Sequence, residues 1–356
     1  MAKASKKVTM PSSPTYRAAV LVEPRRIELQ KMCAPDLASH EALIRVHAAG
    51  VCGTDLAIHD GAYPVSLPLV LGHEWVGTVE AVGDERERHL IGRRVVGEIN
   101  DHCAARKRAP LCAACNAGLP THCLTRTVLG IVGHHGAFAE RTVAPAANLR
   151  PVPAAMSNEA AVFVEPLAAA LQTFAMTPIK PGDTVVVLGC GRLGVLVALV
   201  AKSLGGEVLA FADRREYMEL AQRVGVKAET ELLAKEIADA VRESTYGLGA
   251  DIVVEATGSP DGLALALDCV RPRGTIALKS TPGLPVARFD LTRAVVNEIQ
   301  LQGSRCGQFD AAIQFWERHR PPLERLIVAE FPLDQIAEAI AQAHQPGKVL
   351  VRCASS

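Results

Sequence analysis

The sequence predicts an α/β protein of two domains, one rich in short β-strands and one built on a parallel sheet with crossover helices. The chain has 356 residues, which at about 100–200 residues per domain suggests two domains with cores of their own. From residue 16 to about 164, short β-rich runs are broken by Gly, Pro and polar turns, which favours a β-rich domain. From about residue 166 to 307, short apolar runs alternate with helical stretches, which indicates a parallel sheet.

The individual elements follow from the same patterns. In the first region the expected strands are 17–22, 41–48, 75–82, 93–98 and 138–143. In the second they are 184–188, 208–211, 251–256, 275–279 and 299–302, with helices such as 193–204 and 215–224 between them. The last stretch ends in an apolar strand at 348–351, and we expect it to return to the first domain.

Charge and composition exclude several classes of protein. Lys plus Arg equals Asp plus Glu at 38 each, so neither a nucleic acid nor an anionic membrane surface is an expected partner. No run reaches the ~18–20 apolar residues of a membrane span. Residues 1–15 are rich in Lys, Ser and Pro and have no apolar core, so we expect a disordered tail rather than a signal peptide.

The ten cysteines are unevenly spread, and four of them lie between Cys103 and Cys123. Without a signal peptide we expect a cytoplasmic, reducing location. There, closely spaced cysteines indicate metal binding or catalysis before disulfides.

A glycine-rich turn predicts a dinucleotide site. The strand 184–188 leads into Gly189-Cys190-Gly191-Arg192-Leu193-Gly194, a GxGxxG that opens an apolar helix. Gly189 permits the tight turn, Gly191 lets the backbone approach a pyrophosphate, and Gly194 allows close packing of helix and strand. The alternative is a purely structural Gly-rich turn. The position between a strand and a helix favours the cofactor.

The choice of cofactor depends on the end of the next strand. Asp213 lies nineteen residues beyond Gly194, where a carboxylate accepts the ribose hydroxyls of NAD. Arg214 and Arg215 follow at once, and guanidinium groups suit the 2′-phosphate of NADP. We therefore expect NAD, with NADP as the alternative.

Three later positions are weaker candidates for contact with the nucleotide. Thr257 and Lys279 follow the ends of the next two strands, where capping of the strand is an equally good explanation. Lys348 precedes the last strand, and it is either a pyrophosphate contact or a solvated edge residue.

Two groups of residues have the chemistry of zinc ligands. In the first domain, Cys52, His73 and Glu74 stand in short glycine-containing segments, and Glu165 lies in an apolar run where a carboxylate needs a partner. Thiolate, imidazole and carboxylate are the ligands of catalytic zinc, which keeps one position open. The second group is suited to a closed structural zinc site and consists of Cys103, Cys112, Cys115 and Cys123.

Together these motifs resemble the zinc-containing medium-chain dehydrogenase/reductase family, the alcohol dehydrogenases, over about residues 16–352. The motifs that carry the resemblance are Gly-Val-Cys-Gly-Thr-Asp-Leu (50–56), Gly-His-Glu-Trp-Val-Gly (72–77), the four-cysteine lobe, Glu-Pro-Leu-Ala (165–168) and the GxGxxG (189–194). The resemblance implies a GroES-like catalytic domain (16–165 and 309–356) with a structural zinc lobe at about 98–125. A doubly wound Rossmann domain (166–308) is inserted between the two pieces.

The resemblance also implies roles for individual residues. Cys52, His73 and Glu165 match the catalytic zinc positions, with Glu74 a fourth or alternating ligand, and Thr54 matches the hydroxyl that begins a proton relay. Glu at position 165 resembles the polyol, threonine and butanediol dehydrogenase branch.

Two features depart from the family pattern. Residues 104–111 enlarge the first spacing of the structural lobe, and Ala57 stands where a relay histidine is often found. His59 lies two residues farther on, and whether it joins the relay is left open.

The expected function is reversible oxidation of a secondary alcohol (a polyol, diol or amino alcohol) by hydride transfer to NAD, with two zinc ions per chain. The alternatives are a zinc-dependent reductase that uses NADPH on aldehydes or ketones, and a non-catalytic nucleotide-binding protein. The strand at 299–302 is a plausible sheet edge, so we expect a homo-oligomer, either a dimer or a tetramer.

Overall fold

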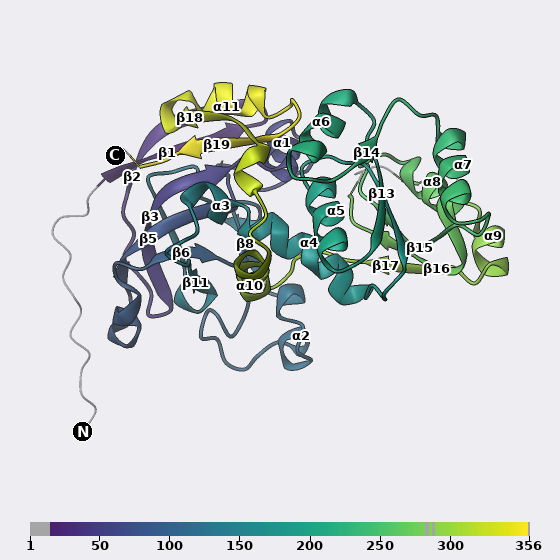
Figure 1. Cartoon of the computed structure of the whole chain (residues 1–356). Coiled ribbons are helices and arrows are strands. Elements are labelled where there is room, and N and C mark those ends of the chain that lie inside the picture. The colour runs from purple at the N-terminus through teal and green to yellow at the C-terminus, as the bar shows by residue number, and fades with distance from the viewer. Residues whose placement is uncertain (1–14, 282–284, 287–288, 355–356) are drawn as a thin grey trace.

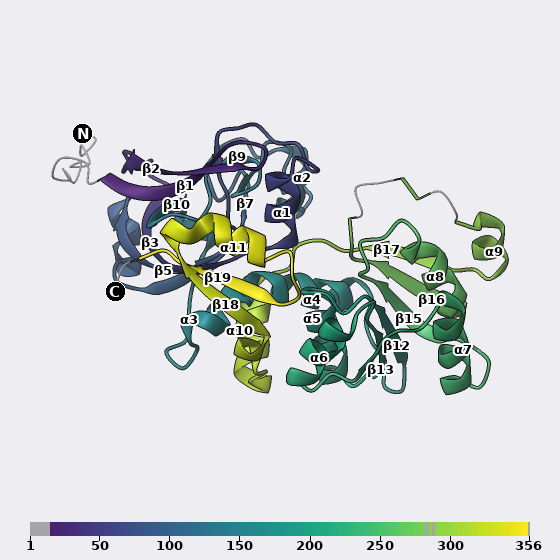
Figure 2. The ribbon, with the colours of Figure 1, turned by 90° about the horizontal axis from the view of Figure 1, so that it is seen from above.

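A β-rich body and a Rossmann-type body lie side by side in the computed structural model, which describes residues 15–281, 285–286 and 289–354 (Figures 1 and 2). All but the last residue of the predicted tail, 1–15, lies outside the described residues.

The β-rich body consists of two main sheets. The smaller has the strand order β2-β1-β4, and the larger has the order β11-β6-β5-β3-β19-β18, with β10 also paired to β3. The bounds are β1 Thr15–Glu23, β2 Arg26–Cys33, β3 Glu41–Gly50, β4 Leu69–Val70, β5 Glu74–Val82, β6 Arg94–Gly97, β10 Arg141–Pro145, β11 Leu149–Pro151, β18 Ile327–Pro332 and β19 Lys348–Arg352. Since β19 pairs with both β3 and β18, the end of the chain returns to the first body, as predicted.

A small lobe projects from this body near α2 (Figure 1). It contains a three-stranded sheet and a one-turn helix, whose bounds are β7 Asn100–Asp101, β8 Thr127–Leu129, β9 Gly133–His134 and α2 Ala113–Asn116. The buried Asp101 carboxylate ties the sheet together, because it lies against the His134 ring and accepts a hydrogen bond from Thr127.

The second body is a six-stranded parallel sheet of order β14-β13-β12-β15-β16-β17. Its strands are β12 Thr184–Leu188, β13 Glu207–Phe211, β14 Ala228–Glu229, β15 Ala250–Glu255, β16 Val270–Leu278 and β17 Gln300–Gly303. From β12 the chain first builds the sheet outward through β13 to β14, and it then returns to the other side of β12 to build β15, β16 and β17. The carboxyl ends of β12 and β15, on either side of this switch point, form the expected nucleotide site.

Helices cover the Rossmann sheet and connect the two bodies. The helices are α1 Gly53–His59, α3 Asn158–Val162, α4 Val164–Met176, α5 Gly194–Ser203, α6 Arg215–Arg223, α7 Ala234–Ser244, α8 Gly262–Cys269, α9 Leu291–Val296, α10 Phe309–His319 and α11 Ile336–Gln342. One apolar cluster includes side chains of β5, α4, α5, α10 and β12, so a continuous core passes from one body to the other through α4. None of the helices in the described part of the chain is long and apolar enough to cross a membrane.

The observed fold confirms the predicted class, and one strand prediction needs correction. The strand expected at 138–143 begins only at Arg141. The backbone just before it is engaged elsewhere, because Ala137 and Phe138 donate to the carbonyls of Gly72 and Leu71. The predicted domain boundaries fall in the first turn of α4 and at the start of α10, and they stay predictions.

Candidate active site and metal centres

Two strands and a short helix bring three of the predicted zinc ligands together. Cys52 caps the N-terminus of α1, two residues after β3, and His73 and Glu74 lie at the start of β5. Strands β3 and β5 pair with Gly50 opposite Glu74, which sets these two ends beside each other. The ligand atoms of Cys52, His73 and Glu74 all lie within 4.8 Å of one another. This donor set fits a zinc ion with an open position.

Asp55, which was not among the predicted site residues, orients this group. It is fully buried, and its carboxylate accepts the N–H of Cys52 at 2.8 Å and the N–H of Gly72 at 3.1 Å. Its Oδ1 also lies 3.3 Å from Nδ1 of His73, which leaves Nε2 of the imidazole for a metal. The sequence carries a signal for this residue, because an acid three positions after a helix cap is typical of a capping box.

Glu74 has an unexpected partner. Lys348, at the start of β19, is 3% exposed, and its ammonium donates to Oε2 of Glu74 and lies 3.4 Å from the carbonyl of Val51. Lys348 is therefore not a solvated edge residue. Because its ammonium is paired with Glu74, it is also not free to bind a pyrophosphate. The ion pair holds Glu74 beside Cys52 and His73.

Glu165 does not belong to the 4.8 Å group, although it lies within the electrostatic reach of its members. It is in the first turn of α4 and half-buried. Burial raises the pKa of the Glu165 carboxyl, the charge of Glu74 adds to this, and His73, Lys348 and Lys279 act against it. Its role as a ligand stays a prediction.

The site favours positive charge at its centre. Burial disfavours the imidazolium of His73, but Asp55 and Cys52 outweigh this effect and raise the pKa of His73 well above its usual value. A group of acids that stabilises a buried cation in this way has the electrostatics of a metal site.

Thr54 and His59 lie on different faces of α1. Thr54 is half-buried in the first turn, and His59 is the last residue of the helix. Five residues turn a helix by about 140°, and the His59 ring lies 2.9 Å from Asp60 Oδ1. The structure thus gives His59 a partner other than Thr54.

The four lobe cysteines form a second compact group. Their four Sγ atoms all lie within 4.8 Å of one another. The Sγ of Cys123 is 3.5 Å from the Sγ of Cys103 and 3.7 Å from the Sγ of Cys112. Burial disfavours a thiolate at Cys123, but hydrogen bonds from Thr125 outweigh it and lower the pKa of Cys123 to about 6. Four sulfurs at this spacing fit a closed zinc site.

The enlarged loop of the lobe does not disturb this cluster. Lys107, inside the loop, donates to the carbonyl of Ser39 at 3.0 Å and to Asp84 at 3.1 Å. The extra residues therefore bind the lobe to the β-rich body, and Cys103 still reaches the other three cysteines.

The glycine loop has the geometry of a dinucleotide site. Gly189 has φ +91°, and a Cβ on Gly194 would stand 1.8 Å from the Gly189 carbonyl oxygen, so both positions require glycine. A Cβ on Gly191 would meet nothing within 4 Å, which leaves room for a ligand. Leu193 is the N-cap of α5, so the helix N-terminus, where anions bind, begins two residues after Gly191. Arg192 ties the loop to the β-rich body by donating to the carbonyl of Gly347 at 2.9 Å.

The other predicted cofactor residues lie at the carboxyl edge of the sheet. Asp213 is largely exposed, and Arg214 lies 4.0 Å from it and stacks over Tyr217 at 4.7 Å. The N–H and hydroxyl of Thr257 both donate to Glu255, at 2.8 and 2.5 Å. Thr257 thus has a partner within its own strand end, and contact of Thr257, Asp213 and Arg214 with a nucleotide stays a prediction.

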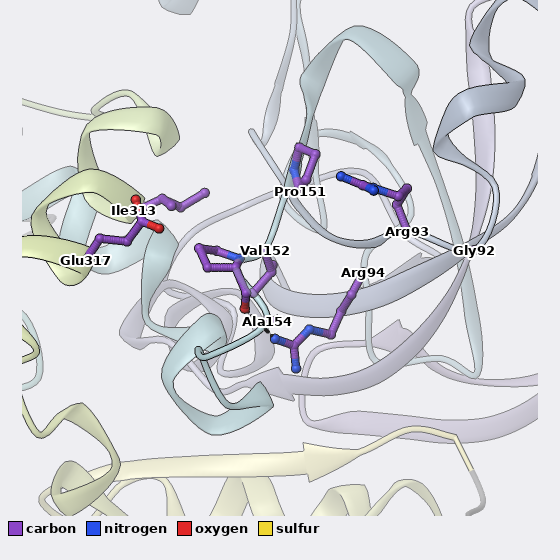
Figure 3. Close-up of a pocket in the computed structure, with 9 residues that line it drawn as sticks. Gly92, Arg93, Arg94, Pro151, Val152, Ala154, Ile313 and Glu317 are labelled. Atoms are coloured by element: carbon purple, nitrogen blue, oxygen red, sulfur yellow. Dashed lines mark hydrogen bonds between the residues drawn. The ribbon is translucent and has the colours of Figure 1, made fainter.

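A cavity of about 670 Å³ lies away from all of these groups. Ile313 and Glu317 of α10 face it from one side, and Pro151 and Val152 from another (Figure 3). Arg94 lines it too, but its guanidinium already donates to the carbonyls of Pro153 and Met156. The cavity contains none of the predicted site residues.

Comparison with known proteins agrees with the fold and the predicted family. The family described as "Alcohol dehydrogenase GroES-like domain" matches residues 38–154, and "Zinc-binding dehydrogenase" matches residues 193–318. A sorbitol dehydrogenase of Halalkalibacterium halodurans is 30% identical over 312 residues, covering 86% of this chain and 89% of its own. An L-threonine 3-dehydrogenase of Bacillus subtilis is 30% identical over 335 residues, covering 91% and 94%.

A solved structure matches equally fully. It is described as a short chain alcohol dehydrogenase of Escherichia coli CFT073 complexed with NADH, and it superposes with a TM-score of 0.86 at 25% identity, covering 95% of this chain and 99% of its own. The chain belongs to the zinc-containing alcohol dehydrogenase family. This confirms the predicted family, the enzyme class and the pairing of zinc with a nicotinamide cofactor.

Proposed function

We propose that this enzyme oxidises a secondary alcohol, namely a polyol, vicinal diol or amino alcohol, with NAD as hydride acceptor and in a reversible reaction. The observation that carries the proposal is the group of Cys52, His73 and Glu74, whose ligand atoms lie within 4.8 Å of one another. The sorbitol and threonine dehydrogenases among its relatives support this substrate class.

Each residue of the site has a proposed task. Cys52 and His73 would hold the catalytic zinc, with Glu165 and Glu74 as carboxylate ligands, and Cys103, Cys112, Cys115 and Cys123 would hold the structural one. When bound, the catalytic zinc supplies a Lewis acid that lowers the pKa of the alcohol, and the nicotinamide supplies the hydride acceptor. Thr54, half-buried and two residues after Cys52, would take the alcohol proton and pass it toward solvent.

The nucleotide would lie along the carboxyl edge of the Rossmann sheet. The open space at Gly191 and the N-terminus of α5 suit the pyrophosphate, and Asp213 suits the ribose hydroxyls of NAD. Arg214, held beside Asp213, favours the second candidate function, a reductase that uses NADPH on aldehydes or ketones. Parallel titration with NAD and NADP separates the two.

We further infer a homo-oligomer in a reducing compartment, the cytoplasm. Strand β17 is the last strand of its sheet, and Leu291, Val295, Val296 and Leu301 beside it are 46–74% exposed, which supports pairing of two copies along this edge. None of the ten cysteines, all of which lie in the described part of the chain, forms a disulfide, in keeping with a reducing location. Light scattering in solution gives the particle mass that tests the oligomer.

The test of the activity uses zinc-loaded protein, a panel of polyols, vicinal diols, threonine and simple alcohols, and nicotinamide absorbance as the readout. The variant Cys52→Ser should lose one of two zinc ions and nearly all turnover while it still binds NAD. Cys33→Ser, at an exposed cysteine at the end of β2, is the matched control and should behave as wild type. Normal turnover by Cys52→Ser, or silence of the two-zinc protein with every alcohol, would refute the proposal.

A further inference from the structure

A buried lysine that the proposed mechanism does not use stands at the carboxyl edge of the Rossmann sheet. Lys279 directly follows β16 and is 8% exposed. Its ammonium donates to the carbonyl of Arg305 at 2.8 Å and lies 3.4 Å from Ser304 Oγ. Within the described parts of the chain it forms no ion pair with a carboxylate. Because burial of an ammonium is costly, this position calls for an explanation.

The charge of Lys279 is felt in the candidate zinc site. Glu165 raises the pKa of Lys279, and Lys279 in turn lowers that of Glu165. Burial is the larger effect and lowers the pKa of Lys279 to about 8, so the ammonium is still the main form at pH 7. Ser304, one of its two partners, lies 3.3 Å from Thr173 of α4, the helix that begins beside Glu165. Lys279 is therefore linked through Ser304 to α4, and its charge acts on Glu165 in the first turn of that helix.

The order of the strands indicates which half of a dinucleotide would lie there. The glycine loop follows β12 and Asp213 follows β13, so the adenosine half belongs to the β12–β14 side of the sheet. The nicotinamide half then belongs to the side of β15, β16 and β17, and hydride transfer would require its ring to lie next to the alcohol carbon that gives up the hydride. Lys279 is on this side and in the field of Glu165.

We propose that the Lys279 ammonium sets the balance between the two redox forms of the cofactor, by weakening the binding of NAD⁺ relative to NADH. The oxidised nicotinamide ring carries one positive charge and the reduced ring carries none, so a fixed cation repels only the oxidised form. In the reaction, a hydride leaves the alcohol carbon with both electrons and neutralises the ring, while the hydroxyl proton goes to solvent. Lys279 favours this direction of transfer. The inference rests on the proposed function, because it needs a nicotinamide at this edge.

The test measures cofactor binding without any substrate. Isothermal titration at pH 7.0 gives the Kd values of NAD⁺, NADH and ADP-ribose, which lacks the nicotinamide ring, for the zinc-loaded wild type and for Lys279→Gln. Glutamine is neutral but keeps a donor for the Arg305 carbonyl. We expect NAD⁺ to bind about tenfold more tightly to the variant, with NADH and ADP-ribose unchanged. Lys279→Arg keeps the charge and should keep the wild-type ratio.

A matched control separates charge at this site from loss of any lysine. Lys202, at the exposed end of α5, donates to the carbonyl of Gly225 at the same 2.8 Å, and Lys202→Gln should leave all three Kd values unchanged. Equal shifts for all three ligands in Lys279→Gln would make the lysine a purely structural residue and overturn the proposal.

Two other results would also overturn the inference. One is an unchanged ratio of NAD⁺ to NADH affinity in Lys279→Gln. The other comes from a separate turnover assay and is a loss of turnover confined to anionic alcohols, which would assign Lys279 to the substrate. Failure of the proposed function looks different, because the wild type itself would then bind neither NAD⁺ nor NADH.

Discussion

The third glycine of the nucleotide loop is packed so closely that even a methyl group would force the backbone apart. A Cβ on Gly194 would stand 1.8 Å from the Gly189 carbonyl oxygen, so that oxygen would have to retreat by about 1.6 Å to reach the 3.4 Å of an ordinary contact. Extra atoms in a packed core cost about 1–3 kcal/mol, and here the obstacle is backbone rather than a flexible side chain. We therefore expect Gly194→Ala to lower the free energy of unfolding by about 3 kcal/mol.

Gly191 in the same loop provides the matched control. An added Cβ there would meet no atom within 4 Å, and the residue is not among the glycines with a positive φ. Gly191→Ala should therefore fold as stably as the wild type. The new methyl group would, however, fill space that the pyrophosphate approaches, so the affinity for NAD should fall by about tenfold or more.

Thermal unfolding followed by circular dichroism, together with calorimetric titration of NAD, measures both effects. At about 2–4 °C per kcal/mol for a unit of 150–250 residues, Gly194→Ala should melt about 6–12 °C below the wild type. A Gly194→Ala protein that melts with the wild type, or a Gly191→Ala protein that binds NAD normally, would refute the steric roles assigned to these two glycines.

Three further predictions concern buried charges. Asp55→Asn replaces an acceptor of two backbone N–H groups and should weaken zinc binding by about 10–100-fold in a chelator competition; unchanged affinity would deny Asp55 its orienting role. Lys348→Met leaves Glu74 buried and unpaired, so it should lower the free energy of unfolding of the zinc-free protein, measured with denaturant, by about 3–5 kcal/mol. The double variant Lys348→Met/Glu74→Gln should regain much of this loss. The pKa of His134 is raised, because its contact with Asp101 outweighs the opposing effect of burial. The charge of His134 therefore stabilises the folded state fully below about pH 6.5, and this stabilisation is lost as the pH rises through the folded-state pKa. The stability difference between wild type and His134→Gln should shrink over that rise, and a difference that widens would contradict the assignment.

The parts of the site that the sequence predicted are those in which neighbouring residues carry the chemistry. The glycine loop and the four-cysteine lobe each occupy a short stretch of chain, and spacing alone was enough to identify them. Cys52, His73 and Glu74 lie in two short segments, and their meeting depends only on the pairing of β3 with β5.

Contacts between residues far apart in the chain were not predictable in this way. Lys348 and Glu74 are 274 residues apart, and they meet because Gly50 of β3 pairs with Leu350 on one side and with Glu74 on the other. The hydrophobic pattern of β19 identifies a strand, but it does not encode this neighbour or its register. Lys279 and Arg305 likewise depend on the packing of the segment after β17.

These buried charges also account for the kind of ion the site can hold. Among the described residues, six groups that act on one another in or around the site carry charge once the ligands are deprotonated as a metal requires. They are Cys52, Asp55, Glu74, Glu165, Lys348 and Lys279. The four acids carry four negative charges and the two lysines carry two positive ones, so two negative charges remain uncompensated. With a neutral His73, one divalent cation makes the group electrically neutral, whereas the same group without a metal has to protonate instead. The pKa of His73 follows the same electrostatics, because Asp55 and Cys52 outweigh the effect of burial and favour a positive charge on the imidazole.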